Sequence, residues 1–91
     1  REMEPEMKLM EAPLLSLFPN PAQNELSIQL SPEVKCDWIR IYNSLGELVY
    51  TKVQLNAEET ALIGIDAWTK GIYFVRALVD GEEINSKFIK N

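Results

Sequence analysis

The sequence contains no histidine, only one cysteine and no long apolar run, and each of these absences excludes a class of function. Zinc and copper sites are built mainly from His and Cys ligands, and a serine or cysteine nucleophile is usually activated by a histidine. The single Cys36 cannot close an internal disulfide, and we interpret it as an ordinary thiol at a strand edge. No apolar run reaches the roughly 18 residues that a membrane-spanning helix needs. We therefore expect no enzymatic activity, no metal or other cofactor and no stable membrane insertion.

Positive charge is also scarce, because nine Lys and Arg stand against fourteen Asp and Glu, a net charge of −5. Proteins bind nucleic acid by neutralising its phosphates with clustered Lys and Arg, and anionic membrane surfaces attract basic segments. The charge balance therefore argues against both nucleic acid and an anionic membrane as partners. A chain of 91 residues is long enough for one domain and too short for a second core.

Residues 1–14 differ in composition from the rest of the chain. A flexible linker and a docked helix both suit this segment, and Pro5 together with the short length favours the linker. The sequence begins at Arg1 without an initiator methionine, so we expect it to be a piece of a longer protein. All three methionines of the sequence lie in this segment: Met3, Met7 and Met10.

From Leu15 onward, short runs of β-branched and aromatic residues alternate with turn residues about every 8–12 positions, which is typical of an all-β sandwich or barrel. A single sheet of this size would leave its apolar face in water, so two packed antiparallel sheets are expected. The pattern predicts about seven strands and no helix, at residues 15–18, 26–30, 37–43, 48–55, 60–66, 72–79 and 84–90.

Strand periodicity predicts which aromatic residues are buried. Ile39 and Ile41 share one face of the third strand, and Trp38 and Tyr42 share the other. An exposed aromatic face would suit sugar stacking, but a sandwich core also needs large side chains, so we expect at least one of these two aromatic residues in the core. Trp68 is expected to close one end of the sandwich.

The almost unbroken apolar run at residues 72–79 has two interpretations. It is either a central strand covered on both faces or a strand whose exposed face meets a partner. Asp80-Gly81 after it is a strong hairpin signal, and Gly46 supplies the left-handed conformation of an earlier turn. The acidic residues at 80–83 also suggest a calcium site, although a plain hairpin turn with solvated acids explains them better.

Three segments, taken in order, resemble a known family. LFPNPAQNELSI at 17–28 resembles the YPNPxxxxLxI opening of the C-terminal sorting domains of the type IX secretion system. IRIYNSLGELV at 39–49 is similar to the central hydrophobic-Tyr-Asp/Asn-xx-Gly-xx-Val segment of these domains. IDAWTKGIYFV at 65–75, followed by Gly81 and KFIK at 87–90, is similar to their closing segment. The resemblance covers the whole chain from Leu15 to Asn91.

The resemblance implies a fold and a function. The family fold is an immunoglobulin-like two-sheet sandwich of seven antiparallel strands. Family members are C-terminal secretion signals of Bacteroidetes-type bacteria, whose folded domain is recognised in the periplasm by the outer-membrane machinery. The expected partners are therefore this machinery, a sorting peptidase that removes the domain, and an N-terminal passenger domain. The passenger is expected in the periplasm in transit and then at the cell surface or secreted, and the cut is expected at or before residues 1–12.

The resemblance also implies a recognition site on the last two strands. Lys87 and Lys90 are the expected exposed contacts, although edge-strand charges that merely block aggregation are an alternative. Two groups of residues are singled out. The structural group, which directs the chain into the sandwich and shapes a turn, is Pro19, Asn20, Pro21 and Gly46. The group expected to be recognised by the export machinery is Gly71, Tyr73, Val75, Gly81, Lys87, Ile89 and Lys90.

Two other functions remain open from the residues alone. A carbohydrate-binding or adhesion module of a surface protein would need an exposed platform formed by Trp38, Tyr42 or Trp68. A structural spacer would self-associate through an exposed edge strand and form a weak homodimer.

Overall fold

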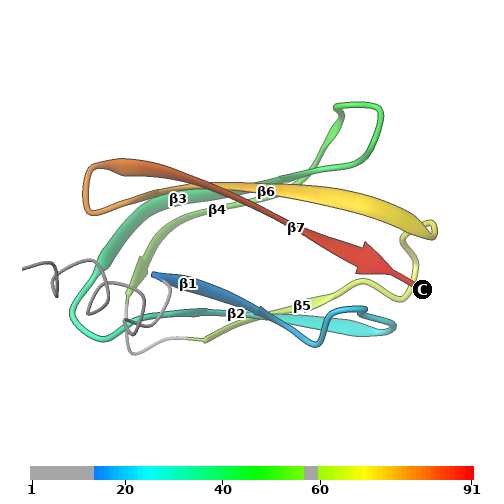
Figure 1. Ribbon diagram of the computed structural model, residues 1–91, viewed down its shortest axis with the longest axis horizontal. Coiled ribbons are helices and arrows are strands. Elements are labelled where there is room, and N and C mark those ends of the chain that lie inside the picture. The colour runs from blue at the N-terminus through cyan, green and yellow to red at the C-terminus, as the bar shows by residue number, and fades with distance from the viewer. Residues whose placement is uncertain (1–13, 57–59) are drawn as a thin grey trace, which may run out of the picture.

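The computed structural model describes residues 14–56 and 60–91, which form a sandwich of two antiparallel sheets (Figure 1). This result confirms the predicted all-β, immunoglobulin-like fold. Within the described residues there is no helix of a length and apolarity that would cross a membrane. The seven strands are β1 (Leu15–Phe18), β2 (Glu25–Leu30), β3 (Lys35–Tyr42), β4 (Leu48–Asn56), β5 (Thr60–Gly64), β6 (Gly71–Val79) and β7 (Glu82–Lys90).

One sheet has the strand order β1-β2-β5 and the other β4-β3-β6-β7. The chain crosses from the first sheet to the second after β2, returns for β5, and crosses again before β6. Figure 1 shows the two layers one above the other, with the last part of β7 running down toward the three-stranded layer. The linker predicted for residues 1–14 lies outside the described residues except for Leu14, which packs against the core and accepts a hydrogen bond from the Ser31 amide at 3.0 Å.

The core lies between the sheets and is filled mainly by aliphatic side chains. Alternation along β2 buries Leu26, Ile28 and Leu30, as their spacing predicted. In β3 the register shifts between Cys36 and Trp38, so that both Cys36 and Ile39 face inward although they are three residues apart.

The prediction that Trp38 or Tyr42 enters the core is wrong. Both side chains are half-buried on the outer face of β3, because Ile39 and Ile41 occupy its inner face. The guanidinium of Arg40 lies 4.1 Å from the centre of the Trp38 ring. A cation in this position is attracted by the ring electrons, and it occupies a surface on which a sugar would have to stack.

The strand β6 lies between β3 and β7, and only one of its faces is covered. Tyr73 and Val75 face the core, whereas Ile72 and Phe74 are each 44% exposed on the outer face. The interpretation of residues 72–79 as a strand covered on both faces is therefore wrong. The structure instead shows a central strand with one exposed apolar face, and the other interpretation, a face that meets a partner, stays a prediction.

The two turn predictions are confirmed by the backbone. Gly46 has a φ of 86°, and Asp80 and Gly81 have φ values of 51° and 79°. Two consecutive residues with positive φ form the two-residue turn that suits the twist of a hairpin. The Asp80 carboxylate accepts a hydrogen bond of 2.8 Å from the Lys35 amide, so it ties this turn to the start of β3.

Replacing Gly81 with valine is expected to lower the free energy of unfolding by about 1–2 kcal/mol, because L residues disfavour the left-handed region. The cost lies in the backbone alone, since a Cβ at Gly81 would meet nothing within 4 Å. The matched control is Gly64→Val on β5, where φ is not in that region and valine suits a strand. Urea unfolding of both variants provides the measurement. Equal losses in the two variants would contradict the backbone explanation.

Candidate functional site

The segments that carry the family resemblance meet at one end of the sandwich, which we call the C-terminal end. Gly71 at the start of β6 pairs with Lys90 at the end of β7, and Ala22 forms a parallel bridge to Lys90. The β3–β4 turn lies at this end too, because Tyr42 pairs with Phe74 (Figure 1). The C-terminal end comprises residues 19–22, 43–47, 65–73 and 88–91.

The Pro-Asn-Pro segment holds the end of β7 through a group of hydrogen bonds that we call the clasp (Asn20 and Ala22 with residues 89–91). The Asn20 side-chain oxygen Oδ1 accepts a bond of 3.0 Å from the Ile89 amide. The Ala22 amide donates to the Ile89 carbonyl at 2.7 Å, and the Asn91 amide donates to the Ala22 carbonyl at 2.8 Å. The last residues of the chain are thus bonded to a loop of the opposite sheet.

The two prolines of this segment restrict the backbone on both sides of Asn20, whose side chain belongs to the clasp. A proline ring locks φ near −65°, and it keeps the residue before it out of the helical region. Asn20 stands between Pro19 and Pro21, so its backbone is restricted while its side chain reaches Ile89. These contacts give the segment a structural role at the C-terminal end.

An aromatic stack fills the core next to the clasp. The rings of Trp68 and Tyr73 lie 5.1 Å apart, and those of Tyr73 and Phe88 lie 5.4 Å apart and are nearly parallel. The Tyr73 hydroxyl donates to the Thr69 carbonyl at 2.6 Å, which ties the β5–β6 turn to the stack. The prediction that Trp68 closes one end of the sandwich is confirmed by its packing against the core.

The structure separates the predicted recognition residues by burial and by position. Tyr73 and Val75 are 3% and 1% exposed, so they shape the strand from inside and offer no surface to a partner. Gly71 and Ile89 lie at the C-terminal end and are exposed. Gly81 lies in the turn at the opposite end of the β6–β7 hairpin, roughly 27 Å away at the usual rise of a strand.

Lys87 and Lys90 point to opposite faces, and the expectation that both are exposed is wrong for Lys90. Lys87 is exposed opposite Phe74, whereas Lys90 is only 8% exposed and its Nζ donates to the Asn91 carbonyl at 2.8 Å. Residues three apart on a regular strand face opposite sides. Because Phe88 is an inward residue, the same alternation places Lys90 inward, and this signal was present in the sequence.

Cys36 lies inside the sandwich and not at a strand edge, since β3 is flanked by β4 and β6. Burial raises the pKa of its thiol, with a smaller opposing effect from the hydrogen bond that its Sγ donates to the Trp38 carbonyl at 3.2 Å. A thiol with a raised pKa is a poor nucleophile at neutral pH. The interpretation of Cys36 as a thiol without activation is supported, although its predicted place was wrong.

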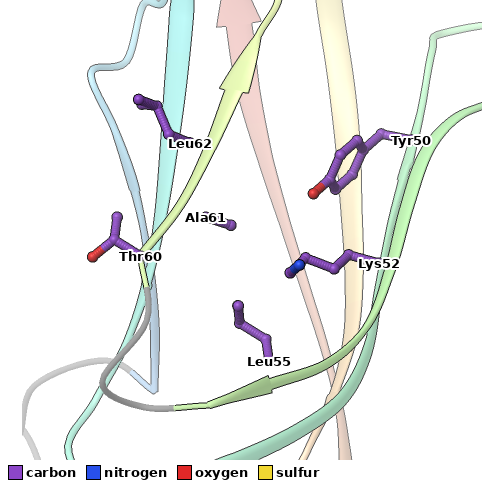
Figure 2. A pocket seen from close by; sticks show the side chains of 6 residues that line it. All are labelled: Tyr50, Lys52, Leu55, Thr60, Ala61 and Leu62. Atoms are coloured by element: carbon purple, nitrogen blue, oxygen red, sulfur yellow. The ribbon is translucent and has the colours of Figure 1, made fainter.

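A hollow lies between β4 and β5. It measures about 360 Å³ and is lined by Tyr50, Lys52, Leu55 and Ala61, together with Thr60 and Leu62. Figure 2 shows Tyr50 and Lys52 reaching from β4 toward β5. Burial raises the pKa of the Tyr50 phenol. This cleft is remote from the clasp, and none of the residues that carry the family resemblance at 65–91 line it.

Replacing Asn20 with alanine is expected to lower the free energy of unfolding by about 1 kcal/mol, the usual net value of a hydrogen bond. The variant frees the Ile89 amide, whose hydrogen exchange should become faster than that of the Tyr73 amide. Asn85→Ala, the same substitution at an exposed position of β7, is the matched control and should leave both quantities unchanged. Unchanged exchange at Ile89 in the Asn20 variant would contradict the clasp.

Taken together, the fold and the clasp define a compact immunoglobulin-like domain whose last strand is bonded to the opposite sheet. The sequence matches the family of secretion system C-terminal sorting domains over residues 16–91, which is nearly the whole described sandwich. The chain therefore belongs to this family, the C-terminal sorting domains of the type IX secretion system of Bacteroidetes. A search of curated proteins finds no match to the sequence.

Family membership assigns the general role of the domain. It is a C-terminal sorting signal for type IX secretion, which implies an interaction with the secretion machinery and a passenger domain to be exported. The destination is the cell surface or the medium.

Proposed function

We propose that the type IX machinery reads this domain as a folded unit in the periplasm, and that a sorting peptidase then cuts it from its passenger. The domain itself catalyses no reaction. Its task is to present one surface, and it is discarded after the passenger has crossed the outer membrane.

The clasp is the observation that carries this proposal. Asn20 and Ile89 are 69 residues apart in the sequence and are bonded only in the folded chain. The motif segments at 17–28, 39–49 and 65–75 likewise converge on the C-terminal end only after both sheets have formed. A receptor that recognises this arrangement recognises the fold, because no short linear peptide contains it.

The proposed absence of catalysis agrees with the chemistry of the side chains. The sequence has no histidine, and Cys36, the one thiol, is buried with a raised pKa. In the described part of the chain, no three Asp, Glu, Cys or His side chains are grouped as metal ligands.

The proposed cut lies at or before residues 1–12, ahead of the sandwich. Peptidases prefer extended segments outside packed structure, and from Leu15 onward most of the described chain belongs to paired strands, which makes it a poor peptidase substrate. Mass spectrometry of the domain released into the medium would locate its new N-terminus. A cut within residues 26–79 would contradict the proposal, because it would sever the paired strands.

The direct test is to fuse the whole chain, residues 1–91, to an inert periplasmic reporter in a host that carries the type IX system. We expect the reporter outside the cell, and we expect it to remain in the periplasm when residues 80–91 are deleted or when the outer-membrane machinery is absent. Export in either of these two altered strains equal to that of the natural fusion would overturn the proposal. The weak homodimer stays a prediction, which sedimentation at several concentrations would test.

A further inference from the structure

The outer face of the four-stranded sheet carries an exposed apolar patch at the C-terminal end. In the ladder, Ile72 stands directly opposite Ile89, and Phe74 stands directly opposite Tyr42. Side chains in such pairs lie on the same face with Cβ atoms about 5 Å apart. Ile72, Phe74 and Ile89 are each 44–45% exposed, which is unusual for neighbouring residues of this size. The apolar patch consists of Tyr42, Leu48, Ile72, Phe74 and Ile89.

Three cations border the apolar patch on the same face. Lys87 stands directly opposite Phe74, and Arg40 stands directly opposite Arg76. Arg76 is paired with Glu83, but Arg40 forms no ion pair with any residue that the structure describes. Like charges directly opposite one another destabilise a sheet. A chain with a net charge of −5 has thus placed two arginines and a lysine together at the margin of an apolar surface.

We infer that this face, and not the β6–β7 hairpin alone, is the surface that the secretion machinery binds, and that the partner presents an apolar centre bordered by carboxylates. The inference rests on the proposed function and names the chemistry of the partner. Stable interfaces have an apolar centre and a polar rim, and complementary charge at the rim guides the two surfaces together. The guanidinium of Arg40, which contacts the Trp38 ring but no carboxylate among the described residues, gains a charged partner in such a complex.

The charges argue against two other occupants of the face. A second copy docked face to face would bring Arg40, Arg76 and Lys87 close to the same three cations, and in the described part of the chain Arg76 alone among them has an ion-pair partner, Glu83. An anionic membrane would attract the three cations but repel the rest of an acidic chain. A protein surface with clustered carboxylates would attract the three cations, without the cation–cation repulsion of a second copy and without the extended negative charge of a membrane.

The key variant is Arg40→Glu, because it separates export from folding. It replaces the like-charge pair with Arg76 by an opposite-charge pair and also removes the contact of the guanidinium with the Trp38 ring, two effects of opposite sign and of about 1 kcal/mol or less each, so the variant should fold with a stability close to that of the natural chain. The same variant should reduce export of the 1–91 reporter fusion at least fivefold. The matched control, Lys52→Glu, makes the same change of charge on β4 beside the cleft and should export normally.

The apolar half of the face is tested with the double variant Ile72→Ser and Phe74→Ser. Leu62→Ser, a change at an exposed apolar residue of the other sheet, is the control. We expect export to fall at least tenfold for the double variant and to stay unchanged for the control. Urea unfolding of the purified chains identifies any loss of export that comes from unfolding. If the double variant does not fold, Arg40→Glu alone tests whether this face binds the machinery.

The outcomes separate this inference from the proposed function. If the natural fusion stays in the periplasm, the proposed function fails. If the natural fusion is exported and Arg40→Glu, stably folded, is exported equally well, the inference alone fails.

Two further measurements test the other occupants of the face. Flotation of the natural chain with vesicles containing phosphatidylglycerol, lost in Arg40→Glu, would assign the face to lipid. A dimer in sedimentation that is lost in the Ile72 and Phe74 variant would assign it to a second copy. Either result overturns the inference, whereas export of Arg40→Glu restored by an acidic-to-basic change in a machinery protein would support it.

Discussion

Replacing Phe88 with alanine is expected to remove about 3–5 kcal/mol from the free energy of unfolding, the usual cost of deleting a buried aromatic ring. Phe88 is fully buried in β7 and stacks on Tyr73, which in turn contacts Trp68. A domain of this size has about 5–14 kcal/mol of stability in total. The variant should therefore be largely destabilised, and export should fall with it, because the clasp and the apolar patch both depend on β7.

Urea unfolding followed by tryptophan fluorescence suits this test, since Trp68 belongs to the same aromatic stack. The control is Ile89→Ala, the next residue of β7, whose side chain is 45% exposed on the outer face. Its loss should be about 1 kcal/mol, because only about half of its surface is removed from water. A loss for Phe88→Ala no larger than that of the control would show that the ring is not part of the core.

Replacing Lys90 with glutamate is expected to cost about 1–3 kcal/mol, because a carboxylate would be placed in a buried site facing the oxygen of a carbonyl. The Lys90 Nζ now donates to the Asn91 carbonyl, and the side chain lies on the same inner face as Phe88. Lys87→Glu, on the exposed face, should change stability by less than about 0.5 kcal/mol. Thermal unfolding of the two variants measures the difference directly.

The two lysine variants also differ in what they report about export. Lys87→Glu alters the border of the apolar patch without altering the core, so any loss of export comes from the surface. Lys90→Met keeps the buried aliphatic stem and removes the charge, so its stability should lie between that of Lys90→Glu and that of the natural chain. Equal stability of Lys87→Glu and Lys90→Glu would contradict the different burial of these positions.

Strand positions and turn types were predictable from the sequence because both are local properties. Alternation with a period of two marked Leu26 and Ile28 as inward residues, and the core confirms this. Asp80-Gly81 specified a two-residue turn with positive φ at both positions, and the backbone has it. These features depend on neighbours within a few residues, which the sequence displays directly.

The burial of particular side chains was less predictable because it depends on the second sheet. At least one of Trp38 and Tyr42 was expected inside on account of its size, yet the inner face of β3 is already filled by Ile39 and Ile41. Lys90 was expected outside on account of its charge, although the alternation from Phe88 places it inward. In both cases the burial of the side chain was determined by the face of the strand on which it lies, and not by its size or charge.

The geometry of the candidate site was likewise not predictable from local sequence. Gly81 was grouped with Gly71 and Lys90 because all three belong to the closing motif of the family, but the length of the hairpin places Gly81 at the other end of the sandwich. Asn20 was interpreted as part of a proline-rich turn, and nothing near it in the sequence indicates a bond to Ile89. Contacts between residues so far apart are decided by sheet pairing and register.

The amino-acid sequence by itself determined the family, the all-β architecture, the seven strands and their turns, because hydrophobic period and turn chemistry act locally. Only the tertiary structure decided that the Pro-Asn-Pro segment clasps the end of β7, that Lys90 is buried while Lys87 is exposed, and that apolar and cationic side chains share one outer face. The physical reason is that each of these features arises where strands distant in the sequence pair or pack, and such pairings form only when the two sheets close on a common core.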